Sequence, residues 1–209
     1  MLGIENYIGF LVAGIILNIT PGADTMYIIT RSIAQGKKAG YYSVFGITTG
    51  GLIHTLFASL GLSIVLAKSA TAFMIVKYTG VAYLLYLGIK MITEKQNIFD
   101  SNNSNIEPAS LKKIYGQGVF TNVLNPKVAL FFLSFLPQFV NHETVTGPLP
   151  FLILGITFMT TGTLWCLFIA YASSAITSTL RDNRKIAGIM QKVSGAVFIA
   201  LGIKLLTDR

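Results

Sequence analysis

Charged residues are scarce in this chain of 209 residues: they make up 11% of it, whereas 53% of the residues are hydrophobic. Soluble domains carry about 25% charged residues, so the charge here is too little to cover a water-facing surface. The shortage excludes an ordinary soluble protein and predicts that lipid covers much of the surface. The length suits a single transmembrane domain, 1–209.

Cysteine and histidine are scarcer still. The one cysteine, Cys166, excludes an internal disulfide and dithiol redox chemistry. The two histidines, His54 and His142, stand apart from each other, and no metal-ligand spacing occurs in the sequence. We therefore expect no cofactor, no metal site, no catalytic residues and no enzyme activity.

The net charge of +8 does not indicate a nucleic-acid partner. The Lys and Arg residues gather at the ends of apolar runs, where the orientation of a membrane protein explains them better. The apolar N-terminal stretch lacks the basic start and the small-residue cleavage site of a signal peptide. We therefore expect it to remain in place as a first membrane span.

Six apolar segments fit, some only approximately, the roughly 20 mainly apolar residues that a membrane span needs. They are 3–20 with an apolar continuation to 34, 41–67, 70–92, 114–139, 149–177 and 187–206. The stretch 93–113 is the one long polar segment, and its Asn, Ser and Pro content predicts a surface loop at about 96–112. Since no strand-like alternation occurs, the predicted fold class is an all-α membrane protein of about six transmembrane helices.

The distribution of basic residues predicts the orientation of these spans. Eleven of the sixteen Lys and Arg residues follow the first, third and fifth spans, and four lie on the opposite side. This bias predicts cytoplasmic odd-numbered loops and both termini outside. If 3–34 forms a re-entrant pair rather than a full span, the N-terminus lies inside instead.

The chain also repeats itself. The segment 88–95 (GIKMITEK) closes the third span and 202–209 (GIKLLTDR) closes the sixth, with four of eight positions identical. Because a three-span unit leaves the membrane opposite its entry, a tandem copy of it is inverted. We expect two inverted three-helix repeats, repeat A at about 1–95 and repeat B at about 113–209. Chance similarity of short apolar segments is the alternative.

Each repeat carries a polar break in its first helix, at Pro21 and at Pro126. A proline removes a backbone donor and clashes with the preceding turn, which frees carbonyls that need partners within the membrane. The half-helix after each break begins with exposed N–H groups, which favour a carboxylate. Matched breaks in corresponding halves indicate a transporter site, whereas either proline alone can serve helix packing.

The candidate residues for binding substrate or a proton surround these breaks. Asp24 and Lys127 are charges in apolar segments, and each costs about 2.5–3.5 kcal/mol at the centre of a span. Asp24 can take a substrate ammonium or a coupling proton, and Lys127 a carboxylate; alternatively they pair with each other, or Asp24 caps a helix. His54 can face the cavity and titrate, or be satisfied by a neighbouring helix. The full candidate set is Asn18, Thr20, Pro21, Gly22, Asp24, His54, Asn122, Asn125, Pro126 and Lys127.

Glycines recur at helical spacing just before His54. Gly46 and Gly50 are four residues apart, a spacing that lets two helix backbones approach closely in a membrane. The pattern predicts close helix packing along the second span.

At these positions the chain resembles the LysE/RhtB family of amino acid exporters. The segments 20–27 (TPGADTMY) and 31–40 are similar to the first-helix signature of that family, and 80–88 (GVAYLLYLG) is similar to its third. The segment 118–127 (GVFTNVLNPK), followed by the phenylalanines of 131–139, is similar to its fourth-helix signature. The resemblance covers nearly the whole chain in the order of the family. One departure is Ala23, which replaces the second proline usual in the first signature and should soften the break after Pro21.

The resemblance implies a secondary exporter of amino acids or their derivatives in the inner membrane of a bacterium. It further implies that the proton motive force drives export and that the protein forms homo-oligomers, such as a dimer. The expected partners are the amino acid substrate and the lipid bilayer. Neutral substrates are favoured because Asp24 is the one obvious intramembrane acid and a basic substrate brings an extra cation. Export of basic amino acids, or of inorganic or metal ions, remains as an alternative.

Overall fold

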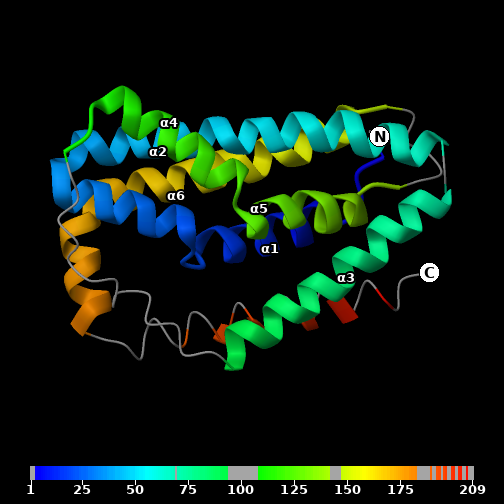
Figure 1. The fold of residues 1–209 in the computed structure, drawn as a ribbon. Coiled ribbons are helices and arrows are strands. Elements are labelled where there is room, and N and C mark those ends of the chain that lie inside the picture. The colour runs from blue at the N-terminus through cyan, green and yellow to red at the C-terminus, as the bar shows by residue number, and fades with distance from the viewer. Residues whose placement is uncertain are drawn as a thin grey trace.

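The computed structural model describes residues 3–68, 70–93, 108–141 and 147–182, and single positions and pairs between 189 and 206. Within these residues every regular element is helical, and short connecting stretches and an isolated β-bridge that joins Ile4 to Val140 make up the rest. The elements in chain order are α1 (Tyr7–Ile19), α2 (Ala23–Lys68), α3 (Ala70–Thr93), α4 (Leu111–Val123), α5 (Pro126–Leu130), the π-helical turn η1 (Phe131–Phe135), the 3-10 turn η2 (Leu136–Phe139) and α6 (Leu149–Asp182) (Figure 1). The predicted all-helical class is confirmed for this part of the chain.

Two described segments are long and apolar enough to cross a membrane by length and composition, Leu149–Ser173 and Ala23–Leu62, the second of which is interrupted at Gly36. The pair Leu111–Val123 and Pro126–Phe139, bent by 47°, makes a third if it is one broken span. α1 is apolar but has only 13 residues. The count of six spans stays a prediction. The predicted loop at 96–112 lies mostly outside the described residues.

The first apolar segment is broken twice. α1 ends at Ile19, and the helix resumes at Ala23 after the Thr20-Pro21-Gly22 sequence. Gly36 has a φ of 82° and a ψ of 174°, so α2 consists of two helices, 23–35 and 37–68, joined at this residue. A positive φ costs glycine little because it has no Cβ.

Contacts along α6 show that α1 and the helix 23–35 run on in one direction. The side chain of Asn18 in α1 bonds the carbonyl of Phe158, with an N–O distance of 3.2 Å. Further along the helix 23–35 and along α6, Ile28 packs in one buried cluster with Ile169. Because the contacting positions rise together, the chain passes the break without doubling back. The geometry is that of one helix broken at 20–22, and a full first span stays a prediction.

The helix 37–68 runs antiparallel to α6. A Cβ on Gly40 would lie 3.2 Å from Ala170, and Gly51, eleven residues later, faces Met159 instead. In Figure 1 the two long helices lie along each other over most of their lengths.

The same helix runs parallel to α4 and packs closely against it. Gly46 faces the backbone of Tyr115 and Gly118, and a Cβ added at Gly46 would collide with the Tyr115 carbonyl oxygen. A Cβ on Gly50 would lie 2.8 Å from the Cβ of Asn122. The close helix packing predicted at Gly46 and Gly50 is therefore confirmed.

α3 runs antiparallel to the described positions near the end of the chain. A Cβ on Gly88 would lie 2.7 Å from the carbonyl oxygen of Gly195. A Cβ on Gly202 would lie 2.9 Å from a methyl group of Leu85. The residue numbers of the contacting positions thus decrease along α3 as they increase along the segment near the end of the chain.

Candidate functional site

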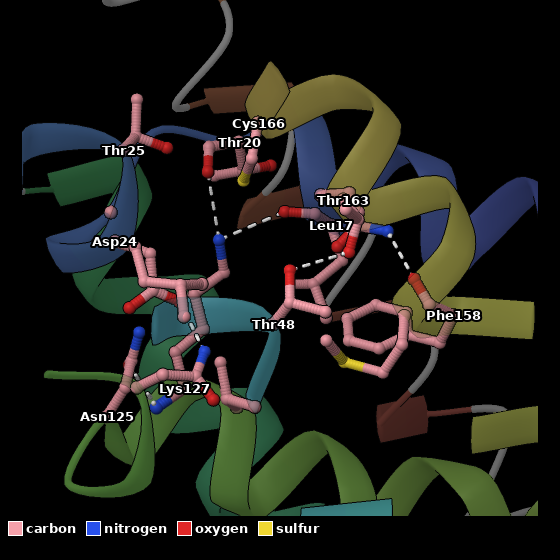
Figure 2. A pocket seen from close by; sticks show the side chains of 17 residues that line it. Leu17, Thr20, Asp24, Thr25, Thr48, Asn125, Lys127, Phe158, Thr163 and Cys166 are labelled. Carbon is pink, nitrogen blue, oxygen red and sulfur yellow. Dashed lines mark hydrogen bonds between the residues drawn. The ribbon is translucent and has the colours of Figure 1, made fainter. Parts of the chain in front are cut away.

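A cavity of about 60 Å³ lies where the two helix breaks meet the middle of α6 (Figure 2). A cavity needs roughly 10–15 Å³ of such volume to hold one water, so this cavity has room for a few waters. Its walls come from the end of α1, both helices of α2, the α4–α5 break and α6. The polar residues in these walls are Asn18, Thr20, Asp24, Thr25, Thr48, Asn122, Asn125, Lys127 and Thr163.

Most of the predicted site residues line this cavity. The seven that do are Asn18, Thr20, Gly22, Asp24, Asn122, Asn125 and Lys127. Pro21 and Pro126 sit in the two breaks, next in sequence to lining residues, but do not line the cavity themselves. His54 does not line it either and lies against the α4–α5 break. The structure therefore gathers residues more than 100 positions apart in sequence around one small space.

Lys127 closes the first break. Pro21 has no N–H group, so the Leu17 carbonyl, four residues earlier, loses its helical partner. The Lys127 ammonium donates to this carbonyl at 3.0 Å and to the Thr20 carbonyl at 2.9 Å, as the dashed lines in Figure 2 show. Its positive charge thereby lies at the negative end of the α1 dipole. Two of the three ammonium N–H groups are used here, and the third can bind a ligand.

His54 and Asn125 close the second break. Pro126 deprives the Asn122 carbonyl of its helical partner in the same way. The Asn125 N–H reaches this carbonyl at 3.0 Å, and the His54 Nε2 lies 3.1 Å from it. The side-chain oxygen of Asn125 accepts from the Lys127 N–H at 3.1 Å and so caps α5.

Asp24 carries an oxygen with no partner. Its Oδ2 accepts a hydrogen bond of 2.8 Å from the Asn122 side-chain amide. Its Oδ1 is buried and has no hydrogen-bond partner among the described residues. Such an orphan acceptor is costly in a protein interior, which is why it points to a ligand or a proton.

Neither structural alternative for Asp24 takes the form of a direct hydrogen bond among the described residues. The Lys127 ammonium makes its hydrogen bonds to backbone carbonyls and not to the Asp24 carboxylate. α2 begins at Ala23, so Asp24 lies within the first helical turn and is not the residue that caps it. The carboxylate still benefits from the positive end of the helix dipole.

Sequence reasoning missed the wall that α6 supplies. Thr163 shares a hydrogen bond of 2.9 Å with Thr48, and Met159, Gly162 and Cys166 also line the cavity. These α6 residues carry no charge and no helix break, so no strong sequence signal marks them. Their spacing of three to four positions along one helix face is the signal that was available.

On one side of the cavity, a polar network joins the helix 23–35 to the start of α4. It consists of Tyr27, Arg31, Gln35, Ala109 and Gln117. The Gln117 side-chain oxygen accepts from Arg31 at 2.9 Å and from the Tyr27 hydroxyl at 3.4 Å. Arg31 also donates to the Gln35 side chain at 2.9 Å. Gln35 in turn donates to the Ala109 carbonyl at 2.9 Å and accepts from its N–H at 3.1 Å.

On the other side of the break, an aromatic cluster fills the space between α1, η1, η2 and α6. It consists of Phe10, Phe131, Phe135, Phe139 and Phe158, all buried. The Phe10 ring lies 6.1 Å from the rings of Phe131 and Phe135, and Phe131 stacks on Phe158 at 4.1 Å between centroids. The cavity therefore lies between the polar network, which is hydrogen-bonded, and the aromatic cluster, which is apolar.

A helical membrane protein whose interrupted helices enclose a polar cavity has the construction of a transporter for small solutes. The chain belongs to the LysE type translocator family, whose model matches residues 15–209. It is therefore a transporter and not an enzyme, and the family resemblance read from its motifs is confirmed.

Sequence similarity to other proteins extends over almost the whole chain. An uncharacterized membrane protein of Bacillus subtilis, YrhP, is 36% identical over 194 residues, which are 89% of this chain and 91% of the relative. Proteins named leucine efflux protein are similar too: that of Klebsiella pneumoniae is 29% identical over 98% of this chain and 96% of its own length. That of Salmonella choleraesuis is 28% identical over the same shares. No solved structure matches this chain.

Proposed function

We propose that this protein exports amino acids, preferentially neutral ones such as leucine, across the bacterial inner membrane. The observation that carries the proposal is the buried Asp24 oxygen without a partner, in one cavity with Lys127. The ammonium of an amino acid binds this oxygen, and its carboxylate binds the remaining N–H of Lys127. A zwitterion brings both charges at once, so the cavity stays electrically balanced.

The lining favours a neutral side chain over a basic one. Ile47, Val128 and Met159 offer an apolar wall for an aliphatic side chain. Asp24 is the one acidic residue among those that line the cavity, so the second cation of lysine or arginine would lack a partner there. The same lining disfavours a metal-ion path, which needs several carboxylate or imidazole ligands.

Proton coupling follows if the substrate ammonium and a proton compete for Asp24. Only one of the two can satisfy the Asp24 oxygen at a time. An exporter of this kind releases its amino acid outside, takes up a proton on Asp24 and returns the proton to the cytoplasm. The proton motive force then drives export.

The inverted repeat is supported by the direction of the helix pairs. α6 runs antiparallel to 37–68, and α3 runs antiparallel to the last described positions. The first broken helix runs parallel to α6, whereas α4 runs parallel to 37–68, so the two broken helices are antiparallel. Two inverted three-helix repeats generate these three antiparallel pairs. We propose this arrangement, with six spans and both termini outside.

We further propose that the polar network is the gate toward the cytoplasm. Lys37 and Lys38 follow the helix 23–35, and Lys112 and Lys113 begin α4, so basic residues gather at this end. Such residues favour the cytoplasmic side. Opening there exchanges hydrogen bonds between side chains for hydrogen bonds to water, at small cost. The aromatic cluster closes the outer path.

Besides the substrate, the proposed partners are the lipid bilayer and a second copy of the chain. Large apolar side chains are exposed at many positions along the described helices, for example Phe57 and Ile8 at 74% and Phe120 at 69%. A bilayer covers such a surface favourably. Self-association into a dimer is an expectation from the family resemblance.

Purified protein in liposomes tests the proposed function. With an acidic lumen, we expect labelled leucine to accumulate inside as protons leave, and a protonophore to abolish the accumulation. Lysine and simple cations are expected to stay at the level of protein-free liposomes. Faster lysine flux would support the basic-substrate alternative, and no flux of any amino acid in a broad panel would contradict the proposal.

A further inference from the structure

A side-chain nitrogen lies within hydrogen-bond distance of each carbonyl that loses its helical partner at a proline, and the second of these carbonyls also accepts from the Asn125 N–H. Lys127 takes the Leu17 carbonyl at 3.0 Å, and the His54 Nε2 lies 3.1 Å from the Asn122 carbonyl. Lys127 lines the cavity, whereas His54 lies outside its lining. We therefore do not expect His54 to contact the substrate directly.

The ring of His54 is fixed in one orientation. It stacks on Phe132, with a centroid distance of 5.8 Å and an angle of 17° between the ring planes. Because a carbonyl oxygen only accepts hydrogen bonds, the Nε2 nitrogen must carry the proton. This holds for the neutral Nε2–H tautomer and for the protonated ring alike, so the contact does not require His54 to change its charge.

Asn122 connects this contact to the substrate site. Its carbonyl is held by His54 and by the Asn125 N–H, and its Cβ packs against the backbone at Gly50, where an added Cβ would lie 2.8 Å away. Its side-chain amide donates to the Asp24 Oδ2 at 2.8 Å. Asn122 is only 3% exposed, so the orientation of its amide depends on these few contacts.

We propose that His54 is a positioning residue of the transport site: it holds the Asn122 carbonyl at the helix break and thereby aims Asp24 at the substrate ammonium. The inference rests on the proposed function, since it assigns His54 a role in amino acid binding. Proton uptake stays with Asp24, and His54 acts only through its hydrogen bond.

Two substitutions separate the hydrogen bond from the ring. His54→Phe keeps a flat ring against Phe132 but has no N–H group. His54→Gln can donate an N–H to the Asn122 carbonyl but cannot titrate near neutral pH. We expect the Phe variant to raise the KM for leucine about fivefold, the order of losing one of the two hydrogen bonds to the buried Asn122 carbonyl. The Gln variant should stay within about twofold of the parent in KM and retain proton-driven accumulation.

The outcomes discriminate the possible roles of His54. A parental KM in the Phe variant, or an equal loss in both variants, overturns the positioning role. Loss of proton-driven accumulation in the Gln variant with an unchanged KM makes His54 the proton carrier instead, which also overturns it. If the parent itself moves no amino acid, the proposed function has failed and not the role of His54.

Nitrogen NMR tests the same contact without altering His54. The chain has two histidines, so ¹⁵N-histidine labelling of a His142→Asn variant leaves one signal set. We expect a protonated Nε2 at neutral pH, and a shift of its signal when leucine binds that Asp24→Asn abolishes. A neutral ring protonated at Nδ1, or a signal indifferent to saturating leucine that the protein transports, contradicts the inference.

Discussion

Replacing Asp24 with asparagine is expected to lower leucine transport in proteoliposomes by about 100-fold, which corresponds to about 2.7 kcal/mol. The variant keeps the shape of the side chain and can still bond Asn122. It loses the negative charge that binds the substrate ammonium and the group that takes the coupling proton. Charge-assisted hydrogen bonds are roughly twice as strong as neutral ones, which accounts for a loss of this size.

Glu5→Gln is the matched control. Glu5 is an exposed acid near the start of the chain, where its carboxylate accepts a bond of 2.6 Å from Asn141. The substitution removes one negative charge without touching the cavity, so we expect parental transport. Both variants should unfold within a few degrees of the parent in a thermal melt. Equal transport by Asp24→Asn and Glu5→Gln would remove Asp24 from the site.

Cross-linking the two sides of the polar network is expected to stop transport. Gln35 and Ala109 exchange two hydrogen bonds, so cysteines placed at both positions, in a Cys166→Ser background, lie within reach of a short reducible linker. The linker ties the helix 23–35 to the segment before α4. If these elements must separate to admit substrate from the cytoplasm, transport falls at least about tenfold and returns when a reductant cleaves the linker.

The single-cysteine variants, treated with the same linker, provide the controls. Each should transport like the untreated double variant, because neither can bridge the two elements. The fraction of bridged protein is measured by mass spectrometry. Complete bridging with unchanged leucine flux would mean that the polar network does not open during transport.

Of all parts of the fold, the helix breaks are predicted best by the sequence. Proline lacks an N–H group wherever it occurs, so interruption near Pro21 and Pro126 depends on local chemistry alone. A turn between the segments that end at 34 and begin at 41 was predicted, but its placement at the single residue Gly36 was not, because glycine is also tolerated within membrane helices. The π-helical and 3-10 turns at 131–139 also escaped prediction: Pro137 marks the second of them, but nothing in the phenylalanines before it distinguishes a π-helical turn from regular helix.

The site was predictable to the extent that it is polar and close to a break. Asp24 and Lys127 attract attention because charges in apolar segments need a reason. The partners of these groups depend on how helices lie side by side, which a single sequence does not contain. This is why the bond from His54 to a backbone carbonyl and the α6 wall at Thr163 and Cys166 became apparent only in the structure.

The central claim is that the cavity between the two helix breaks holds the amino acid. The single native cysteine, Cys166, lines this cavity and reports on its occupancy without any substitution. The most direct measurement is the rate at which a small, membrane-permeant methanethiosulfonate modifies Cys166, with and without saturating leucine. We expect leucine to slow the reaction at least about fivefold in the parent and to leave it unchanged in Asp24→Asn. Equal rates in the parent with and without leucine, under conditions in which the parent transports it, would contradict the account.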